Sequence, residues 1–362
     1  MLLNLTILPG DGIGPEVTEQ AVLVLQAVAE TFGHQLQLRH KNIGGAALAA
    51  VNDPLPADTV EACLSSSAVL MGAVGNPAFD HYPNHLRPEA GLLRLRRELG
   101  AYANLRPAIC FPALEDCSPL RAEIVRGTDI MIVRELLGGL YFGEPRSIAG
   151  AAGARVATNT MTYGEEAVER IARVGFELAG KRRGKVLSVD KANVLECSRL
   201  WREVVIRCAK DYPGVKVSHM YVDSAAMSLV QRPQDFDVVL TENMFGDILS
   251  DQAGGVVGSL GLLASASIGG PVGLYEPVHG SAPDIAGKGI ANPLGAILSA
   301  TLLLRHSFKL EAEAVCIENA VSAALNQGFR TPDLVRAGEN ASSTSEMGRV
   351  VVEAVKLREK IG

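Results

Sequence analysis

The chain has 362 residues, and its 34 lysines and arginines against 40 aspartates and glutamates give a formal net charge of −6. Hydrophobic residues make up 48% and charged residues 20%, a balance that excludes a disordered chain. At roughly 100–200 residues per domain, this length predicts two domains. An acidic chain without a basic stripe is a poor candidate for binding nucleic acid or an anionic membrane. An anionic substrate would therefore need a local basic pocket.

Neither a signal peptide nor a membrane anchor is expected. Residues 1–8 are apolar but too few for a signal peptide, and no run approaches the roughly 18 apolar residues of a transmembrane helix. The six cysteines are scattered without a CxxC pair, which is typical of reduced thiols in a cytosolic protein. We therefore expect a cytoplasmic protein.

Strands and helices are predicted to alternate along most of the chain. Residues 5–8 form an apolar strand, and a helix should start at Pro15 and stop before Gly33. Such alternation indicates the α/β class, with a largely parallel sheet covered on both faces. Further strands are expected at 36–38, 68–72, 130–133, 186–189, 215–222 and 236–240, and helices at 56–63, 294–305, 311–325 and 345–360.

A glycine-rich turn at residues 10–14 follows the first strand. The dinucleotide fingerprint G-x-G-x-x-G would need glycine where Pro15 stands, and no acidic residue follows about 20 positions later. The phosphate-binding motif GxxxxGK[ST] is also absent, because Gly289 follows Lys288. On these residues alone, a tight turn before a helix is favoured over a phosphate site.

Two arginines lie at the ends of apolar segments. Arg134 directly follows an expected strand, and ligands of parallel sheets bind outside the carboxyl ends of strands. Guanidinium groups suit bidentate recognition of carboxylates, so Arg134 and Arg106 together favour a di- or tricarboxylate ligand. For each arginine alone, an ordinary surface ion pair is the alternative.

Three aspartates could bind a divalent cation. Asp247 and Asp251 are one turn apart on a helix expected to follow Gly246, so they face one side. With Asp223 they could hold Mg²⁺ or Mn²⁺. The alternatives are a capping or first-turn carboxylate at Asp247 and a solvated one at Asp251.

Lys191 and Tyr141 are candidate acid–base groups. Desolvation can lower the pKa of a lysine that follows an apolar strand, and a tyrosine near cations can donate a proton. The alternatives are a lysine whose stem lies along the surface and a half-buried tyrosine.

Two long motifs carry a family resemblance. Residues 243–251 read Asn-Met-Phe-Gly-Asp-Ile-Leu-Ser-Asp, and residues 276–288 read Glu-Pro-Val-His-Gly-Ser-Ala-Pro-Asp-Ile-Ala-Gly-Lys. With these motifs the chain resembles the β-decarboxylating dehydrogenases, the isocitrate and isopropylmalate dehydrogenase family, over nearly its whole length. The resemblance implies two α/β domains around a continuous, mostly parallel sheet that is not a Rossmann fold. It implies a large cofactor domain of residues 1–101 plus 258–362, and a central domain of residues 102–257 with the dimer interface.

The resemblance also implies an oxidative decarboxylation that uses NAD and Mg²⁺ or Mn²⁺. Tyr141 would be the acid and Lys191 the base, and Lys191 and Asp223 would come from the partner subunit of a homodimer. The implied substrate residues are Leu92, Arg96, Arg106, Arg134 and Asp223; the metal ligands are Asp223, Asp247 and Asp251; and the cofactor residues are Glu89, His279, Gly280, Ser281, Ala282, Asp284, Ile285 and Asn292.

Leu92 bears on the choice of substrate. Within the family, a serine at this position would hydrogen-bond a third carboxylate of the substrate. Leucine would instead pack against an isopropyl group, which is carried by the malate derivative that is oxidised in leucine biosynthesis. Relatives that act on homoisocitrate, tartrate, D-malate or isocitrate are the alternative. A non-catalytic regulatory subunit is disfavoured, because Tyr141, Lys191 and the aspartates are all present. Asp284 favours NAD over NADP, because it would repel a 2′-phosphate.

One loop departs from the family pattern. Residues 75–80 read Gly-Asn-Pro-Ala-Phe-Asp, where members often have Gly-Gly-Pro-Lys-Trp-Asp. Without the lysine and the tryptophan, no ligand role is expected for this loop.

Overall fold

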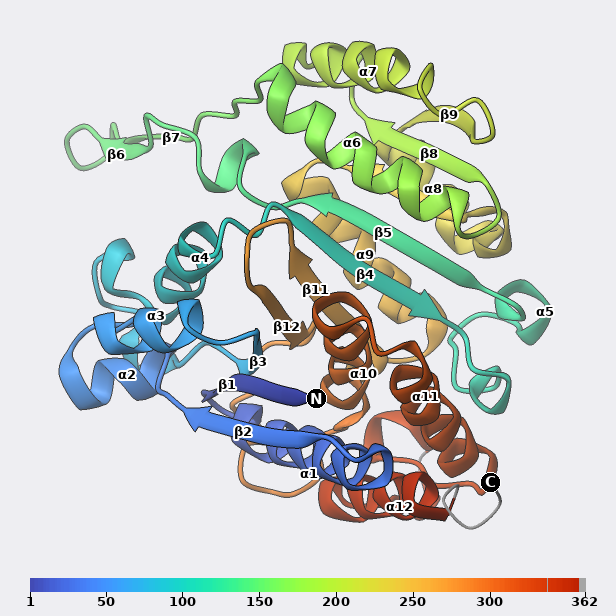
Figure 1. Cartoon of the computed structure of the whole chain (residues 1–362). Coiled ribbons are helices and arrows are strands. Elements are labelled where there is room, and N and C mark those ends of the chain that lie inside the picture. Colours follow the sequence, from blue (N-terminus) through green and yellow to red (C-terminus); the bar gives the residue numbers. More distant parts are fainter. Residues whose placement is uncertain (337, 358–362) are drawn as a thin grey trace.

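A computed structural model describes residues 1–336 and 338–357. Ten strands form one sheet in the order β2-β1-β3-β12-β11-β4-β5-β10-β8-β9 (Figure 1). In chain order these strands are β1 (Leu2–Gly10), β2 (Gln35–His40), β3 (Ala68–Ala73), β4 (Ala103–Ile109), β5 (Asp129–Glu135), β8 (Lys185–Asp190), β9 (Lys216–Tyr221), β10 (Val238–Thr241), β11 (Ala264–Ile268) and β12 (Gly273–Pro277).

The sheet consists of two parallel halves joined by an antiparallel centre. β2, β1, β3 and β12 run parallel, as do β5, β10, β8 and β9. β4 is antiparallel to both β5 and β11, and β11 is antiparallel to β12. The prediction of a largely parallel sheet is confirmed, but the sequence did not predict this antiparallel centre.

Helices cover both faces of each half. In the first half, α1, α10, α11 and α12 pack over one face, and α2, α3 and α4 over the other. In the second half, α6 and α7 face α8 and α9 across the sheet. The helices are α1 (Gly14–Phe32), α2 (Gly44–Val51), α3 (Ala57–Leu64), α4 (Pro88–Glu98), α5 (Ala122–Val125), α6 (Glu165–Gly180), α7 (Glu196–Ala209), α8 (Val222–Gln231), α9 (Asn243–Val257), α10 (Leu294–Leu303), α11 (Glu311–Asn326) and α12 (Thr344–Leu357).

Alternation along the strands explains the two-sided core. In β3, Ala68 and Leu70 join the core under α1, whereas Val69 and Met71 join the one under α3 and α4. Because successive side chains of a strand point to opposite faces, a strand buried on both sides must be apolar throughout. All six residues of β3 are buried.

The predicted elements are confirmed, but several of their ends differ; the strand expected at 236–240, for example, is β10 (Val238–Thr241). The strand expected at 215–222 ends at Tyr221, because Val222 begins α8, and the helix expected to reach residue 305 gives way to a π-helical turn at Leu304–Phe308. The helix predicted over 345–360 is α12, and its residues 358–360 lie outside the described part. All six cysteines are free thiols, as expected. None of the described helices is both long and apolar enough to cross a bilayer.

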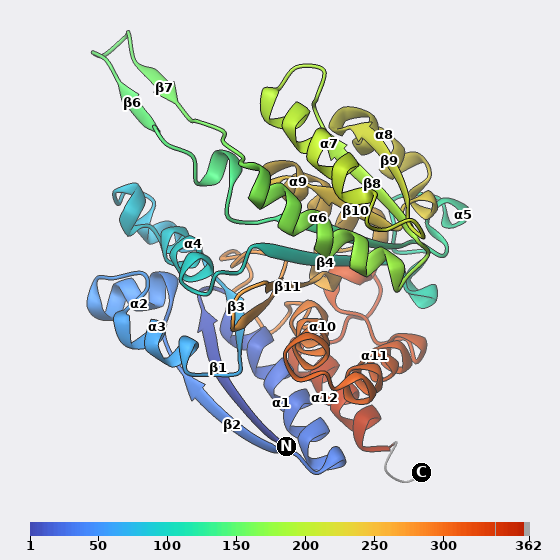
Figure 2. The same cartoon turned by 45° about the horizontal axis from the view of Figure 1, so that its top comes forward.

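A two-stranded arm extends from the second half of the sheet. β6 (Ser147–Ala149) and β7 (Val156–Thr158) pair antiparallel, and every residue of both strands is exposed. Figure 2 shows the arm projecting away from the rest of the molecule. The sequence did not predict this arm.

Candidate active site

The centre of the site contains buried arginines on two neighbouring strands. Arg106 in β4 and Arg134 in β5 are 6% and 1% exposed. Burial, followed by repulsion from Arg106, lowers the pKa of Arg134 to about 9, and burial also lowers the pKa of Arg106. Two buried guanidinium groups that repel each other favour binding of an anion. These side chains form a local basic cluster, which is what the sequence led us to expect of a site for an anionic substrate.

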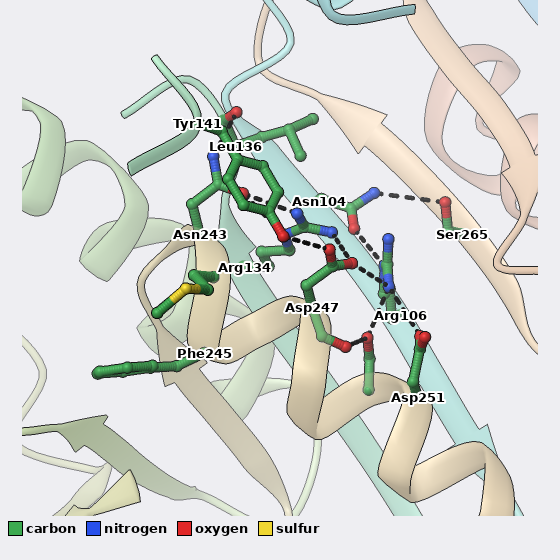
Figure 3. A network of polar contacts seen from close by, with 12 residues as sticks. Asn104, Arg106, Arg134, Leu136, Tyr141, Asn243, Phe245, Asp247, Asp251 and Ser265 are labelled. Atoms are coloured by element: carbon green, nitrogen blue, oxygen red, sulfur yellow. Dashed lines mark hydrogen bonds and ion pairs between the residues drawn. The ribbon is translucent and has the colours of Figure 1, made fainter. Parts of the chain in front are cut away.

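Asp247 joins these arginines to Tyr141. Its Oδ1 lies 2.5 Å from Arg134 Nη1 and 3.2 Å from Arg106 Nη1, and its Oδ2 accepts a hydrogen bond of 2.8 Å from the Tyr141 hydroxyl (Figure 3). Burial raises the pKa of Asp247, but the charges of the two arginines lower it more, so the pKa is lowered overall. Asp251, one turn later, lies 3.5 Å from Arg106 Nη1, and burial raises its pKa. Asp247 and Asp251 therefore face one site, as predicted.

The start of α9 differs from the expectation. The helix begins at Asn243, and Glu242 caps it by accepting hydrogen bonds from the backbone N–H groups of Met244 and Phe245. Gly246 therefore lies inside the helix, and the prediction that the helix follows it was wrong. A Cβ at Gly246 would lie 2.6 Å from Arg134 Cγ, so glycine lets the helix approach that side chain.

Tyr141 ends a short 3₁₀ turn, Gly139–Tyr141, and its ring lies 5.6 Å from the Arg134 guanidinium. Burial, followed by the hydrogen bond to Asp247, raises the pKa of its hydroxyl to about 12. The phenol therefore holds its proton at neutral pH, as a proton donor must.

Lys191 and Asp223 form a separate pair. Lys191 follows β8, Asp223 is in the first turn of α8, and Lys191 Nζ lies 2.5 Å from Asp223 Oδ1. The described residues contain no cluster of three His, Cys, Asp or Glu side chains that could hold a metal. A single chain thus does not bring Asp223 together with Asp247 and Asp251. That Lys191 and Asp223 belong to the partner subunit's site stays a prediction from the family resemblance.

One face of α4 carries three of the predicted residues. Glu89, Leu92 and Arg96 follow helical spacing, so they lie along one side of the helix. Arg96 Nη2 donates to Glu276 Oε1 at 2.7 Å, whereas its Nε is buried without a partner. An unpaired buried donor of this kind is costly, and a substrate carboxylate would satisfy it.

The predicted cofactor loop packs against the glycine turn that follows β1. The carbonyl of Ser281 accepts a hydrogen bond of 2.8 Å from the N–H of Ile13, and a Cβ at Gly12 would lie only 1.9 Å from that carbonyl. Gly12 has a φ of +58° and Ala282 has a φ of +39°. Gly12 therefore makes room for the loop, whereas a Cβ at Gly10 or Gly14 would collide with the backbone of Ala73 at the end of β3. Close packing thus explains these glycines without a phosphate site.

The cofactor loop also has free hydrogen-bonding groups. His279 Nε2 is buried without a partner, and burial lowers the pKa of the imidazole. Asp284 is exposed, and among the described residues its carboxylate has no hydrogen bond or ion pair. Such groups fit a polar ligand with ribose hydroxyls. The side chain of Asn292 is different, because its Oδ1 accepts from the Leu294 N–H and its Nδ2 donates to Asp333.

Sequence reasoning missed the polar residues that hold the arginines. Asn104 Oδ1 accepts from Arg106 Nε at 2.7 Å, Asn243 Oδ1 accepts two bonds from Arg134, and Glu276 pairs with Arg96. The spacing of Asn104 and Arg106 could have revealed the contact between them, since residues two apart in a strand share a face. Asn243 and Glu276 stand first in the two family motifs, but the sequence does not show which arginines they hold, because these partners are distant in the chain.

The fold and the site together define an α/β enzyme in which buried arginines and carboxylates meet at the centre of the sheet, with a polar loop that fits a nucleotide. The chain belongs to the isocitrate/isopropylmalate dehydrogenase family, whose model matches residues 4–351. It is 53% identical to the 3-isopropylmalate dehydrogenase of Aquifex aeolicus over 97% of this chain and 96% of that one. It is 54% identical to the 3-isopropylmalate dehydrogenase of Oleidesulfovibrio alaskensis, over 98% and 100% of the two chains. Among solved structures, isocitrate dehydrogenase from Methylococcus capsulatus superposes with a TM-score of 0.86 at 36% identity, over 97% of this chain and 99% of that one.

Proposed function

We propose that this protein oxidises 3-isopropylmalate with NAD⁺ and decarboxylates it to 4-methyl-2-oxopentanoate and CO₂, in the cytoplasmic biosynthesis of leucine. The observation that carries the proposal is a group of three buried arginines: Arg106 and Arg134 contact Asp247, and Arg96 pairs with Glu276. Leu92 lies on the same face of α4 as Arg96. The names of the relatives that match nearly the whole chain support the same substrate.

The donor set fits a divalent cation. Carboxylate oxygens are the ligands preferred by Mg²⁺ and Mn²⁺, and Asp247 and Asp251 present theirs one helical turn apart. These two residues, with Asp223 of the partner subunit, would hold the cation. Its charge would acidify the substrate hydroxyl and offset negative charge during loss of CO₂.

The cofactor loop fits NAD⁺, which accepts a hydride from the substrate. The residues that would hold it share one loop and the facing turn of α4. Asp284 would accept hydrogen bonds from the adenosine ribose, and the unpaired Nε2 of His279 would form a hydrogen bond with the cofactor. The full set is Glu89, His279, Gly280, Ser281, Ala282, Asp284, Ile285 and Asn292.

The residues of the chain bind the substrate and transfer its protons. Arg96, Arg106 and Arg134 bind the two carboxylates, and Leu92 packs against the isopropyl group. Lys191 of the partner subunit removes the proton of the 2-hydroxyl group. Tyr141 then donates its proton to the carbon that has lost CO₂. The hydroxyl of Tyr141 carries this proton at neutral pH because its pKa is high.

We further propose a homodimer with shared active sites. Apolar side chains of α8 and α9 are exposed, among them Met227 at 58% and Ile248 at 57%, and so are Ile148 and Val156 of the arm. Exposed apolar surface of this kind is typical of an interface. We also place the domain division at residues 1–101 plus 258–362 and residues 102–257. This division is supported by the sheet, because its boundary falls between the antiparallel strands β11 and β4.

The test is NADH formation with a panel of substrates. Purified protein with NAD⁺ and Mg²⁺ should form NADH from 3-isopropylmalate, and a chelator should abolish the reaction. Homoisocitrate, isocitrate, tartrate and D-malate should each react with a kcat/KM at least about tenfold lower. The variant Leu92→Ser should lose this preference. Equal or faster turnover of isocitrate by the wild-type protein would contradict the proposal.

A further inference from the structure

Asn243 is fully buried at the start of α9, and its side chain is saturated with hydrogen bonds. Its Oδ1 accepts from Arg134 Nε at 3.0 Å and from Nη2 at 2.7 Å. Its Nδ2 donates to the carbonyls of Leu136 and Gly138, both at 3.0 Å. One amide therefore joins the Arg134 guanidinium to the turn that leads into Tyr141 (Figure 3).

The turn before Tyr141 is also held through its backbone, since the N–H of Leu136 donates to the Tyr102 carbonyl at 2.8 Å and the N–H of Gly139 donates to the Thr162 carbonyl at 3.2 Å. Glu135 accepts hydrogen bonds from the N–H groups of Leu137 and Gly138, at 3.1 and 2.8 Å, but only Asn243 holds the carbonyls of Leu136 and Gly138 through a side chain among the described residues. The hydrogen bond from Tyr141 to Asp247 would compete with a cation for the same carboxylate. The contacts of Asn243 involve no proposed metal ligand.

We infer that Asn243 is a positioning residue, which couples binding of a substrate carboxylate at Arg134 to proton donation by Tyr141. The inference rests on the proposed function and deepens it. A misplacement of about 1 Å at a reacting group can cost on the order of a hundredfold in rate. The turn that carries Tyr141 must therefore keep a fixed relation to the arginine that orients the substrate, and Asn243 supplies that relation.

The variant Asn243→Asp separates the two functions of the amide. The carboxylate still accepts the hydrogen bonds of Arg134, but it cannot donate to the carbonyls of Leu136 and Gly138, which would then face its oxygens. Asn104→Asp is a matched control. Asn104 also accepts from an arginine, but it donates to the hydroxyls of Ser265 and Ser267, which can rotate and donate to a carboxylate instead.

Hydrogen exchange into the reaction product measures proton transfer separately from hydride transfer. In D₂O with Mg²⁺ and NADH but without CO₂, Tyr141 should exchange the C3 hydrogens of 4-methyl-2-oxopentanoate, as a proton leaves that carbon and a deuteron from solvent replaces it. Nuclear magnetic resonance reports the exchange rate. Isothermal titration of 3-isopropylmalate into the metal-free protein reports binding by the arginines, and thermal unfolding reports folding.

We expect Asn243→Asp to slow exchange and kcat by about 10- to 100-fold, while the Kd for 3-isopropylmalate rises no more than in Asn104→Asp, which places the same new charge beside Arg106. Asn104→Asp, which leaves the turn before Tyr141 unchanged, should slow exchange less than about threefold. Equal exchange in the two variants, or a loss of binding as large as the loss of exchange, would overturn the inference.

Asn243→Ser, which brings no charge next to the carbonyls, replaces Asn243→Asp if that variant does not fold, with the same expected slowing of exchange. If neither variant folds, Asn243 serves folding and the inference is overturned. A wild-type protein that forms no NADH from 3-isopropylmalate would overturn both the inference and the proposed function.

Discussion

Two pairs of an aspartate with a cationic side chain differ sharply in their surroundings. Asp247 contacts Arg106, Arg134 and Tyr141, and its side chain is 33% exposed. Asp223 contacts Lys191, and its side chain is 63% exposed. Because two of its partners are buried arginines, Asp247 is held in a fixed position by contacts within one chain. The Lys191–Asp223 pair lies open to solvent, as expected of a half-site that a second subunit completes.

The largest effect is expected from breaking the buried cluster at Arg134. Arg134→Gln removes a charged donor from both Asp247 and the substrate carboxylate, so kcat/KM should fall about a thousandfold. Arg349, whose exposed guanidinium lies 2.6 Å from Glu353, provides a control, and Arg349→Gln should change kcat/KM less than about twofold. Steady-state kinetics with 3-isopropylmalate measures both. A loss below tenfold for Arg134→Gln would contradict the assignment.

Tyr141→Phe should lower kcat about a hundredfold, because it removes the proton donor while leaving the arginines in place. The KM for 3-isopropylmalate should change less than about threefold. Initial-rate measurements separate the two parameters. A rise in KM with an unchanged kcat would instead assign Tyr141 to substrate binding.

The two aspartates should also differ in their effect on stability. The pKa of Asp247 is lowered below 3.8 in the folded protein, so its carboxylate stabilises the fold above about pH 4 and loses this effect as the pH falls through the folded-state pKa. Asp247→Asn should therefore lower the free energy of unfolding by about 1–3 kcal/mol at pH 7, with a smaller difference at lower pH.

Urea unfolding across this pH range measures the difference. The hydrogen bond from Lys191 also lowers the pKa of Asp223, but this pair is open to solvent. Asp223→Asn should therefore leave the free energy of unfolding unchanged. An equal loss of stability in both variants would remove the distinction between the two pairs.

The smallest effect is expected at the cofactor loop. Asp284→Lys with Ile285→Tyr replaces a carboxylate that accepts from ribose hydroxyls with a cation that attracts a 2′-phosphate. The ratio of kcat/KM for NAD⁺ to that for NADP⁺ should fall by about tenfold or more. An unchanged ratio would count against the assignment of Asp284.

Local patterns in the sequence predicted most of the fold. The apolar runs of β1, β3, β5 and β8 and the long amphipathic helices were identified because their cores are built from periodic apolar residues. β4 was missed because it reads Ala-Asn-Leu-Arg-Pro-Ala-Ile, with buried polar residues in place of an apolar run. Burial of Asn104 and Arg106 is stable only because their partners come from distant segments.

The family motifs include Asn243 and Glu276, but they do not reveal that these residues hold the arginines in place. The roles of Asn243 and Glu276 depend on contacts that span more than 100 residues. The function of Asp11 was also missed, since its buried carboxylate accepts three backbone N–H bonds from Gly45, Ala46 and Gly75. No local pattern encodes such contacts.

Subunit complementation tests most directly whether the two pairs belong to one site built from two chains. Arg134→Gln and Lys191→Ala are each expected to be inactive as homodimers. In a heterodimer, a site that takes Arg134 from one chain and Lys191 from the other would contain both intact residues. Random mixing should then restore about a quarter of the wild-type activity, because half of the dimers are mixed and each has one intact site. If dimer exchange is demonstrated and no activity returns, both residues act within a single chain and the account is wrong.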